Sequence, residues 1–191
     1  MGLRWALWGV VVFSALVTEP MAQVPETPRV SEGPDPRLAT WREMLSGRYR
    51  EVSGDENRAA RDVAIRRSVE ALFPLWRGIA TSRIADGNPV FPTVQIAFHG
   101  GDVEIETPPV RALSPENGDE RRVVGFDHES NHVTHRITPT SLTQTTWTSA
   151  GSRTTRFDLS ADGRRLSLAI EIRSPRLPVP VRYAMHYHRV E

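Results

Sequence analysis

The feature that most limits the fold of this chain is a change of hydrophobic period near residue 90. Residues 55–86 place apolar side chains at steps of three and four residues, which is typical of a helix with one apolar face. From residue 90 to the end of the chain, apolar and polar side chains alternate instead, most clearly over 165–173. A period of two with short turns is typical of antiparallel strands that have one covered face. The sequence therefore predicts a mainly β protein with a helical insertion.

Turn residues divide the alternating part into strands. His99-Gly100-Gly101-Asp102 predicts a tight hairpin, because glycine tolerates the positive φ that such turns need. Residues 108–120 are rich in Pro, Asn, Gly and Asp, so we expect a loop there. An open sheet of this many strands would expose two edges, so we expect an up-and-down antiparallel β-barrel of about 8–10 strands. Its strands are expected at 47–52, 94–98, 102–106, 121–126, 131–138, 141–149, 152–160, 164–173 and 180–190.

Helices are expected on both sides of the first strand. Residues 37–45 predict a short helix with Trp41 on its apolar side. Residues 55–86 predict one long helix between the first and second strands. Pro74 lacks an N–H and clashes with the preceding turn, so this helix is expected to be kinked or broken there. Because the segment has an apolar stripe, we expect it to cover an open end or a flank of the barrel.

The N-terminal residues predict export. Within residues 1–22, Arg4 precedes an apolar run at 5–17, and Ala22 supplies a small residue for cleavage, which is typical of a secretory signal peptide. The apolar run is too short to span a bilayer comfortably, so no stable membrane span is expected after cleavage; an uncleaved anchor is the alternative. The proline-rich residues 23–38 predict a flexible linker. Residues 39–191 are then expected to form a single β-barrel domain.

Composition excludes several classes of function. The chain has no cysteine, which excludes a disulfide framework, a thiolate zinc site and a cysteine nucleophile. An export signal without cysteines fits a bacterial periplasmic or secreted protein. The 24 basic residues, all arginine, and 23 acidic residues give a formal net charge of +1. Nucleic-acid-binding domains are usually strongly basic, so no nucleic-acid partner is expected. The sequence predicts no cofactor and specifies no oligomeric state.

The order of an initial strand, a helical segment and an up-and-down meander resembles the calycin group, which comprises lipocalins and fatty-acid-binding proteins. The position of the helices after the first strand is most similar to the fatty-acid-binding branch. Gly47-Arg48-Tyr49 stands where lipocalins have Gly-x-Trp. Arg182 and Tyr183 are adjacent in the last strand, where fatty-acid-binding proteins often have Arg-x-Tyr to hold a carboxylate. The chain also resembles small secreted lipocalin-like bacterial proteins of unassigned function. The resemblance covers residues 41–191 and implies a closed β-barrel.

The side chains expected to point inward combine apolar walls with a few polar groups. Such a lining is typical of a small-molecule pocket, although the same positions would form the core of a filled barrel. The leading hypothesis is therefore an exported β-barrel that binds a small, mainly apolar ligand. The predicted ligand-binding residues are Tyr49, His135, Gln144, Tyr183 and Tyr187, with Arg176 in the proline-rich connection 174–180 as a residue of the cavity mouth.

Two alternatives remain at this point. The string His128-Glu129-Ser130-Asn131-His132 fits H-E-x-x-H, so a secreted zinc-dependent hydrolase is one of them. That chemistry needs a helix over 126–136, whereas Gly125 and the β-branched residues that follow favour a turn between strands. We therefore predict no catalytic or metal-binding residue, and we expect His186 and His188 on the outer surface. The other alternative is a structural or inhibitory envelope protein that binds another protein through its outer strands.

Overall fold

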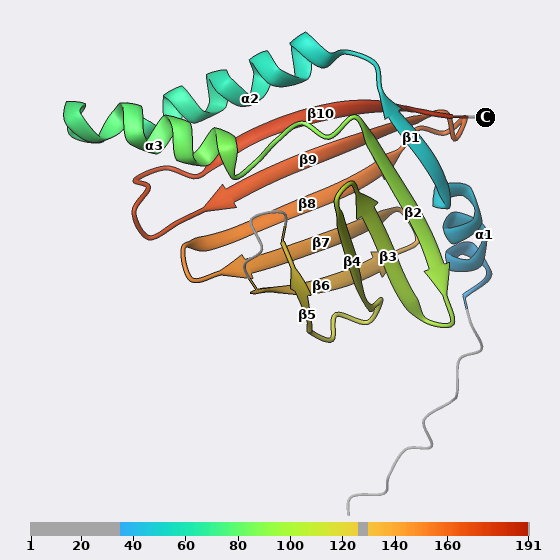
Figure 1. The fold of residues 1–191 in the computed structure, drawn as a ribbon. Helices are drawn as coiled ribbons and strands as arrows, with labels where there is room; N and C mark the ends of the chain where they lie inside the picture. Colours follow the sequence, from blue (N-terminus) through green and yellow to red (C-terminus); the bar gives the residue numbers. More distant parts are fainter. Residues whose placement is uncertain (1–34, 126–129, 191) are drawn as a thin grey trace, which may run out of the picture. The chain divides into compact units, whose positions relative to one another are not determined.

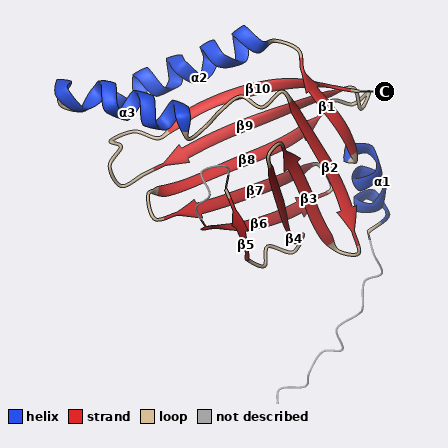
Figure 2. Ribbon diagram, in the orientation of Figure 1, coloured by secondary structure: helices blue, strands red, loops and turns tan. Residues whose placement is uncertain are grey.

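The structure, a computed structural model, describes residues 35–125 and 130–190. These residues form three helices and ten strands (Figures 1 and 2). The helices are α1 (Pro36–Leu45), α2 (Gly54–Val69) and α3 (Pro74–Asp86). The strands are β1 (Gly47–Glu51), β2 (Thr93–His99), β3 (Asp102–Thr107), β4 (Val110–Pro115), β5 (Arg121–Val124), β6 (Ser130–Thr138), β7 (Ser141–Thr148), β8 (Gly151–Leu159), β9 (Arg165–Arg173) and β10 (Val181–Arg189).

All ten strands belong to one antiparallel sheet in the order β4-β3-β2-β1-β10-β9-β8-β7-β6-β5. Neighbours in this order are also neighbours in the chain except at β1, which pairs with β2 on one side and with β10 on the other. The first strand therefore joins the second strand to the last, and the sheet curls into a nearly closed barrel (Figure 1). The predicted fold class, an up-and-down barrel of 8–10 strands with helices between the first and second strands, is confirmed.

The ring is closed differently at the seam between β4 and β5, which form no ladder with each other in the described residues. Contacts between β4, its C-terminal extension and β6 hold this seam together. Ser114 Oγ lies 2.8 Å from His135 Nδ1, and the backbone N–H of Ile137 donates to the carbonyl of Glu116 at 3.2 Å. The other ring nitrogen of His135 lies 2.9 Å from Gln144 Nε2 on β7. One buried imidazole thus connects three strands across the seam.

The two ends of the barrel differ. At one end, where β1 begins and β10 ends, α1 packs with Trp41 and Leu45 in the hydrophobic core; we call this the closed end. At the other end lie the connections β3–β4, β7–β8 and β9–β10 together with α2 and α3 (Figure 1). We call this second end the open end, because the cavity described below opens there.

Helix α2 covers the part of β10 that the short strand β1 leaves unpaired. Asn57, which is 2% exposed, accepts a hydrogen bond from the N–H of His186 at 3.0 Å and donates one to its carbonyl at 3.1 Å. One side-chain amide thus replaces a strand neighbour for both backbone groups. Further along, Ser68 Oγ donates to the carbonyl of Val179 just before β10. Side chains of the helix thus pair with backbone groups at His186 and Val179, where β1 does not reach.

The helical predictions agree with the structure in most respects. The long helical segment is broken as predicted, since α2 ends at Val69 and α3 begins at Pro74, where proline suits the first helical position. The predicted 37–45 helix is present as α1, which starts at Pro36, so the last residues of the predicted 23–38 linker are helical. The predicted signal peptide at 1–22 lies outside the described residues. None of the helices in the described residues is long and apolar enough to cross a membrane.

The predicted loop at 108–120 is wrong, because it contains strand β4. Ala112 and Ser114 point inward and are buried, so the alternation is present. The strand covers only six residues, however; Pro109 precedes it and Pro115 is its last residue, so the segment has the composition of a loop. Pairing with β3 makes this short segment a strand.

We predict that Asn57→Ala destabilises the protein by about 2 kcal/mol, because it removes both hydrogen bonds between the Asn57 side chain and the backbone of His186. Urea denaturation followed by circular dichroism measures this change. Glu56→Ala, one residue earlier on the exposed side of α2, is the matched control and should change stability by less than about 0.5 kcal/mol. Equal effects of the two substitutions would contradict the edge-covering role of Asn57.

We also predict that acid weakens the fold through His135. Burial lowers the pKa of His135 from 6.5 to about 4. Below pH 6.5 the unfolded chain therefore binds a proton that the folded chain does not, so the free energy of unfolding should fall as the pH drops from 6.5 towards 4, by on the order of 3 kcal/mol in total. His135→Gln, which does not titrate, should flatten this slope, and His188→Gln on the outer surface should retain it. Identical slopes for the wild type and His135→Gln would disprove the assignment.

Candidate functional site

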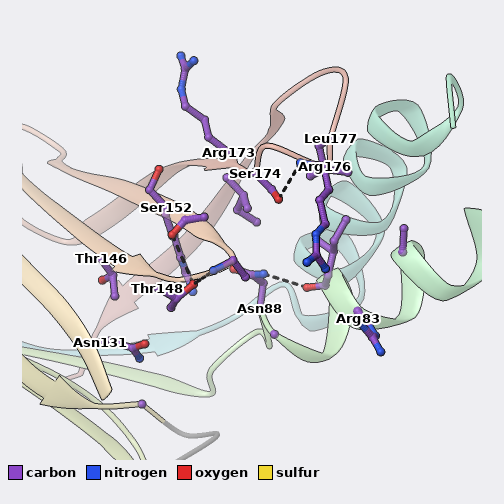
Figure 3. Close-up of a pocket in the computed structure, with 18 of the residues that line it drawn as sticks. Arg83, Asn88, Asn131, Thr146, Thr148, Ser152, Arg173, Ser174, Arg176 and Leu177 are labelled. Atoms are coloured by element: carbon purple, nitrogen blue, oxygen red, sulfur yellow. Dashed lines mark hydrogen bonds between the residues drawn. The ribbon is translucent and has the colours of Figure 1, made fainter. Parts of the chain in front are cut away.

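A cavity of about 960 Å³ lies at the open end of the barrel (Figure 3). Helix α3, the inner faces of β3, β4 and β6–β9, and the connection between β9 and β10 line it. Its volume is near the top of the range of small-molecule sites, which is roughly 300–1,000 Å³. The barrel therefore has room for a ligand inside.

The cavity exists because the inner side chains near the open end are small. There, Thr148 of β7 lies opposite Gly151 of β8. Nearer the closed end, Leu142 lies opposite Phe157, which in turn lies opposite Leu168, and these three large buried side chains fill the barrel. The same three strands thus form a packed core at one end and the wall of a cavity at the other.

The charged residues of the cavity wall all have one sign. Within the part of the chain that the structure describes, the wall contains four arginines and no Asp or Glu. Arg173 contacts the carboxylate of Glu171, which neutralises it. Arg83 on α3 and Arg176 in the β9–β10 connection are exposed at the mouth (Figure 3), whereas Arg153 lies half-buried on the inner face of β8. The cavity is therefore electropositive, which favours an anionic ligand.

Three buried polar atoms in and beside this cavity have no hydrogen-bond partner among the described residues. They are Nε of Arg153, Oδ1 of Asn131 and the hydroxyl of Tyr183. Arg153 and Asn131 line the cavity. Tyr183 is 9% exposed; burial raises its pKa, and the charge of Arg153 opposes this rise. Because buried polar groups are normally paired, the fold leaves hydrogen bonding incomplete in the cluster that Arg153 forms with the neighbouring Tyr183.

Two of the six residues predicted from the sequence line the cavity, namely Gln144 and Arg176. Gln144 reaches it from β7, while its amide nitrogen contacts His135. Arg176 extends toward α3 at the mouth (Figure 3). Neither position demonstrates ligand contact, so both remain predicted ligand-binding residues.

The other four predicted residues lie outside the cavity wall. Tyr49 donates to the carbonyl of Leu45 at 2.8 Å, accepts from Arg189 at 2.7 Å, and burial raises its pKa to about 12 despite the charge of Arg189. Tyr187 donates to the carbonyl of Phe91 at 3.1 Å. His135 closes the seam, as described above, and Tyr183 belongs to the cluster around Arg153. Tyr49 and Tyr187 thus have structural partners, and their proposed ligand contacts remain predictions.

The H-E-x-x-H string does not lie on a helix where the structure describes it. Ser130, Asn131 and His132 belong to strand β6, while His128 and Glu129 lie outside the described residues. His132 projects from the outer face of the barrel and contacts the carboxylate of Glu120. The helix over 126–136 that the zinc-hydrolase alternative requires is therefore contradicted over residues 130–136.

The sequence interpretation missed Arg153, Asn131, Thr146 and Thr148 as lining residues. Arginine in a strand is normally assigned to the solvent face. A signal was nevertheless present, because Arg153 has the same parity in β8 as the buried residues Thr155 and Phe157. An inward arginine in an otherwise apolar and threonine-rich face could have been found by extending that alternation.

The sequence matches no family model and no curated protein. Among solved structures, fatty-acid-binding protein 1 from Echinococcus granulosus is similar, with a TM-score of 0.51 and 12% identity over 78% of this chain and 99% of that chain. A fatty-acid-binding protein from Schistosoma mansoni, solved with arachidonic acid, has a TM-score of 0.47 and 15% identity over 78% of this chain and 98% of that chain. The described part of this chain therefore has the calycin-type β-barrel fold that the order of its elements implied.

Proposed function

We propose that this protein binds a small, mainly apolar ligand with an anionic group inside its barrel, and that it acts as a binding protein rather than an enzyme. The size of the cavity and the apolar residues of α3, β3 and β4 in its wall support an apolar ligand body. The similar protein from Echinococcus granulosus is named a fatty-acid-binding protein, which agrees with this class of ligand.

The observation that carries the proposal is Arg153. Its guanidinium reaches the cavity from the inner face of β8, its Nε is buried without a partner, and the described part of the wall offers no carboxylate to it. A carboxylate or sulfonate of a ligand would accept hydrogen bonds from the guanidinium of Arg153. The two exposed arginines at the mouth, Arg83 and Arg176, would attract such an anion from solution.

We also propose that the protein is exported. The support is the sequence of residues 1–22, with Arg4, the apolar run and Ala22 in the order that a signal peptidase recognises. N-terminal sequencing of the protein recovered from its source cells should find a chain that starts at Gln23. A chain that retains residues 1–22 would instead support the uncleaved anchor.

We predict that the protein binds palmitate more tightly than hexadecanol, which has the same chain length but no charge. In isothermal titration calorimetry, Arg153→Met should weaken palmitate binding about 10- to 100-fold, the loss expected for a charge-assisted hydrogen bond, and leave hexadecanol binding nearly unchanged. Arg156→Met, on the outer face of the same strand with its side chain 58% exposed, is the matched control.

The control variant should bind palmitate like the wild type. Two results would overturn the proposal. One is the absence of saturable binding of either compound to the wild type. The other is an equal effect of Arg153→Met and Arg156→Met on palmitate affinity, because the inner arginine would then have no role in recognising the anion.

A further inference from the structure

A chain of three polar side chains leads from the cavity to the seam between β4 and β6. Gln144 of β7 lines the cavity, and its Nε2 lies 2.9 Å from Nε2 of His135. The other ring nitrogen of His135, Nδ1, lies 2.8 Å from Oγ of Ser114 on β4. His135 and Ser114 are fully buried. The imidazole thus connects a side chain that a ligand can reach with a contact that closes the barrel.

The hydrogen bonds determine where the neutral His135 ring carries its proton. The amide nitrogen of Gln144 can only donate, so Nε2 of the ring accepts and the proton lies on Nδ1. Nδ1 then donates to Ser114, and the hydrogen bond to Ser114 opposes the lowering of the pKa of His135 that burial causes. The carbonyl oxygen of Gln144 has no partner among the described residues, yet it is not one of their fully buried unpaired atoms. This oxygen is therefore accessible from the cavity that Gln144 lines.

No charged side chain among the described residues bonds to the His135 ring. β4, β5 and β7 pack beside β6, and β4 and β7 present Ser114 and Gln144 to the ring. On β6 itself, His132 and Arg136 lie on the outer face. The charged side chains on β4, on β5 and between these two strands are exposed or bonded to other side chains, namely Arg111, Glu116, Asp119, Glu120, Arg121 and Arg122. Burial is therefore the main cause of the low pKa of His135.

A second proton on His135 would change the group that Gln144 presents to a ligand. A protonated Nε2 is a donor, so it cannot pair with the amide nitrogen of Gln144, which is also a donor. Rotation of the amide by half a turn brings its carbonyl oxygen to the Nε2–H and directs its NH2 group toward the cavity. The cavity wall then offers a donor in place of an acceptor, beside a positively charged ring.

The rotated amide would lie close to the arginine that is proposed to bind the anion. Gln144 lies opposite Thr155 of β8, and Arg153 is two residues from Thr155 on the same inner face. Such diagonal neighbours lie about 7–8 Å apart, which is close enough for the two long side chains to meet at one anion. An anion bonded to Arg153 therefore gains a second donor when His135 is protonated. When His135 is neutral, the carbonyl oxygen of Gln144 lies there instead and repels the anion.

We propose that anion binding in the cavity is coupled to protonation of His135 through the amide of Gln144. The protein then binds its ligand more tightly in acid and takes up a proton as it binds. This inference rests on the proposed function and describes the regulation of the same site. The coupling is reciprocal, because a ligand that favours the protonated ring also raises the pKa of that ring. A neutral medium, in which His135 loses the proton, favours release of the ligand.

The test uses 1-decanesulfonate below its aggregation concentration, because its sulfonate stays ionised at pH 7.5 and at pH 5. Isothermal titration calorimetry at the two pH values measures the affinity, and buffers of different ionisation enthalpy report the protons taken up. If the ligand raises the pKa of His135 from about 4 to between about 5 and 6, affinity should be about two- to ten-fold higher at pH 5. About half a proton or more should then be taken up per ligand at pH 5.

Two variants remove the coupling in different ways. His135→Gln does not titrate, and Gln144→Met keeps a side chain of similar length without an amide. Each should abolish most of the difference in affinity between the two pH values. Gln95→Met, at an exposed position on the outer face of β2, is matched to Gln144→Met and should retain the difference. Nitrogen-15 NMR of the wild type should find the Nδ1–H tautomer of His135 at pH 7.5 and a higher pKa of this ring with decanesulfonate bound.

The outcomes separate this inference from the proposed function. Affinity for decanesulfonate that is equal at both pH values, or weaker at pH 5, overturns the coupling and leaves the anionic ligand class standing. An increase at pH 5 that either His135→Gln or Gln144→Met retains in full also overturns it, because another group would then take up the proton. An Nε2–H tautomer of His135 at pH 7.5 contradicts the rotation of the amide. If decanesulfonate does not bind at either pH, the proposed function fails and this inference fails with it.

Discussion

The barrel depends on the double pairing of β1, a strand of only five residues. Tyr49 lies opposite Val94 of β2 on one side and opposite Arg189 of β10 on the other. Among the described residues, these two ladders are the strand pairing that connects β2–β4 with β5–β10. Arg189 reinforces the joint, because its guanidinium donates to the carbonyls of Gly163 and Ser46 and lies 5.0 Å from the centre of the Tyr49 ring.

Closing the sheet turns the alternation of each strand into an inside and an outside. Once the inside exists, side-chain volume decides whether it is core or cavity. Leu142 and Phe157 fill the closed end, and Thr148 and Gly151 leave space at the open end. The site is therefore a consequence of where small residues fall along strands that are otherwise alike. At the open end, helix α3 lines part of the remaining space.

The sequence predicts the fold better than the site, for a physical reason. Alternation of period two is repeated in every strand. The prediction of a barrel is therefore correct even though one short strand, β4, was predicted as a loop. The wall of a cavity depends on which inner residues are small or charged and on which neighbours pack beside them. Gln144 and Arg176 were found because they are polar groups at inward or mouth positions. Tyr49 and Tyr187 have the same features in sequence, but their hydroxyls reach backbone carbonyls instead.

Arg153, which the sequence interpretation missed as a lining residue, bears on the proposed function. A half-buried guanidinium on an inner strand face loses part of its hydration, and the described cavity wall contains no acidic side chain to pair with it. Packing alone would favour an aliphatic side chain at this position, beside Thr146 and Ile172. The position of Arg153 is therefore consistent with its proposed role in binding an anionic group. In the proposed function, an anionic group of the ligand supplies the partner that the described wall does not provide for the Arg153 guanidinium.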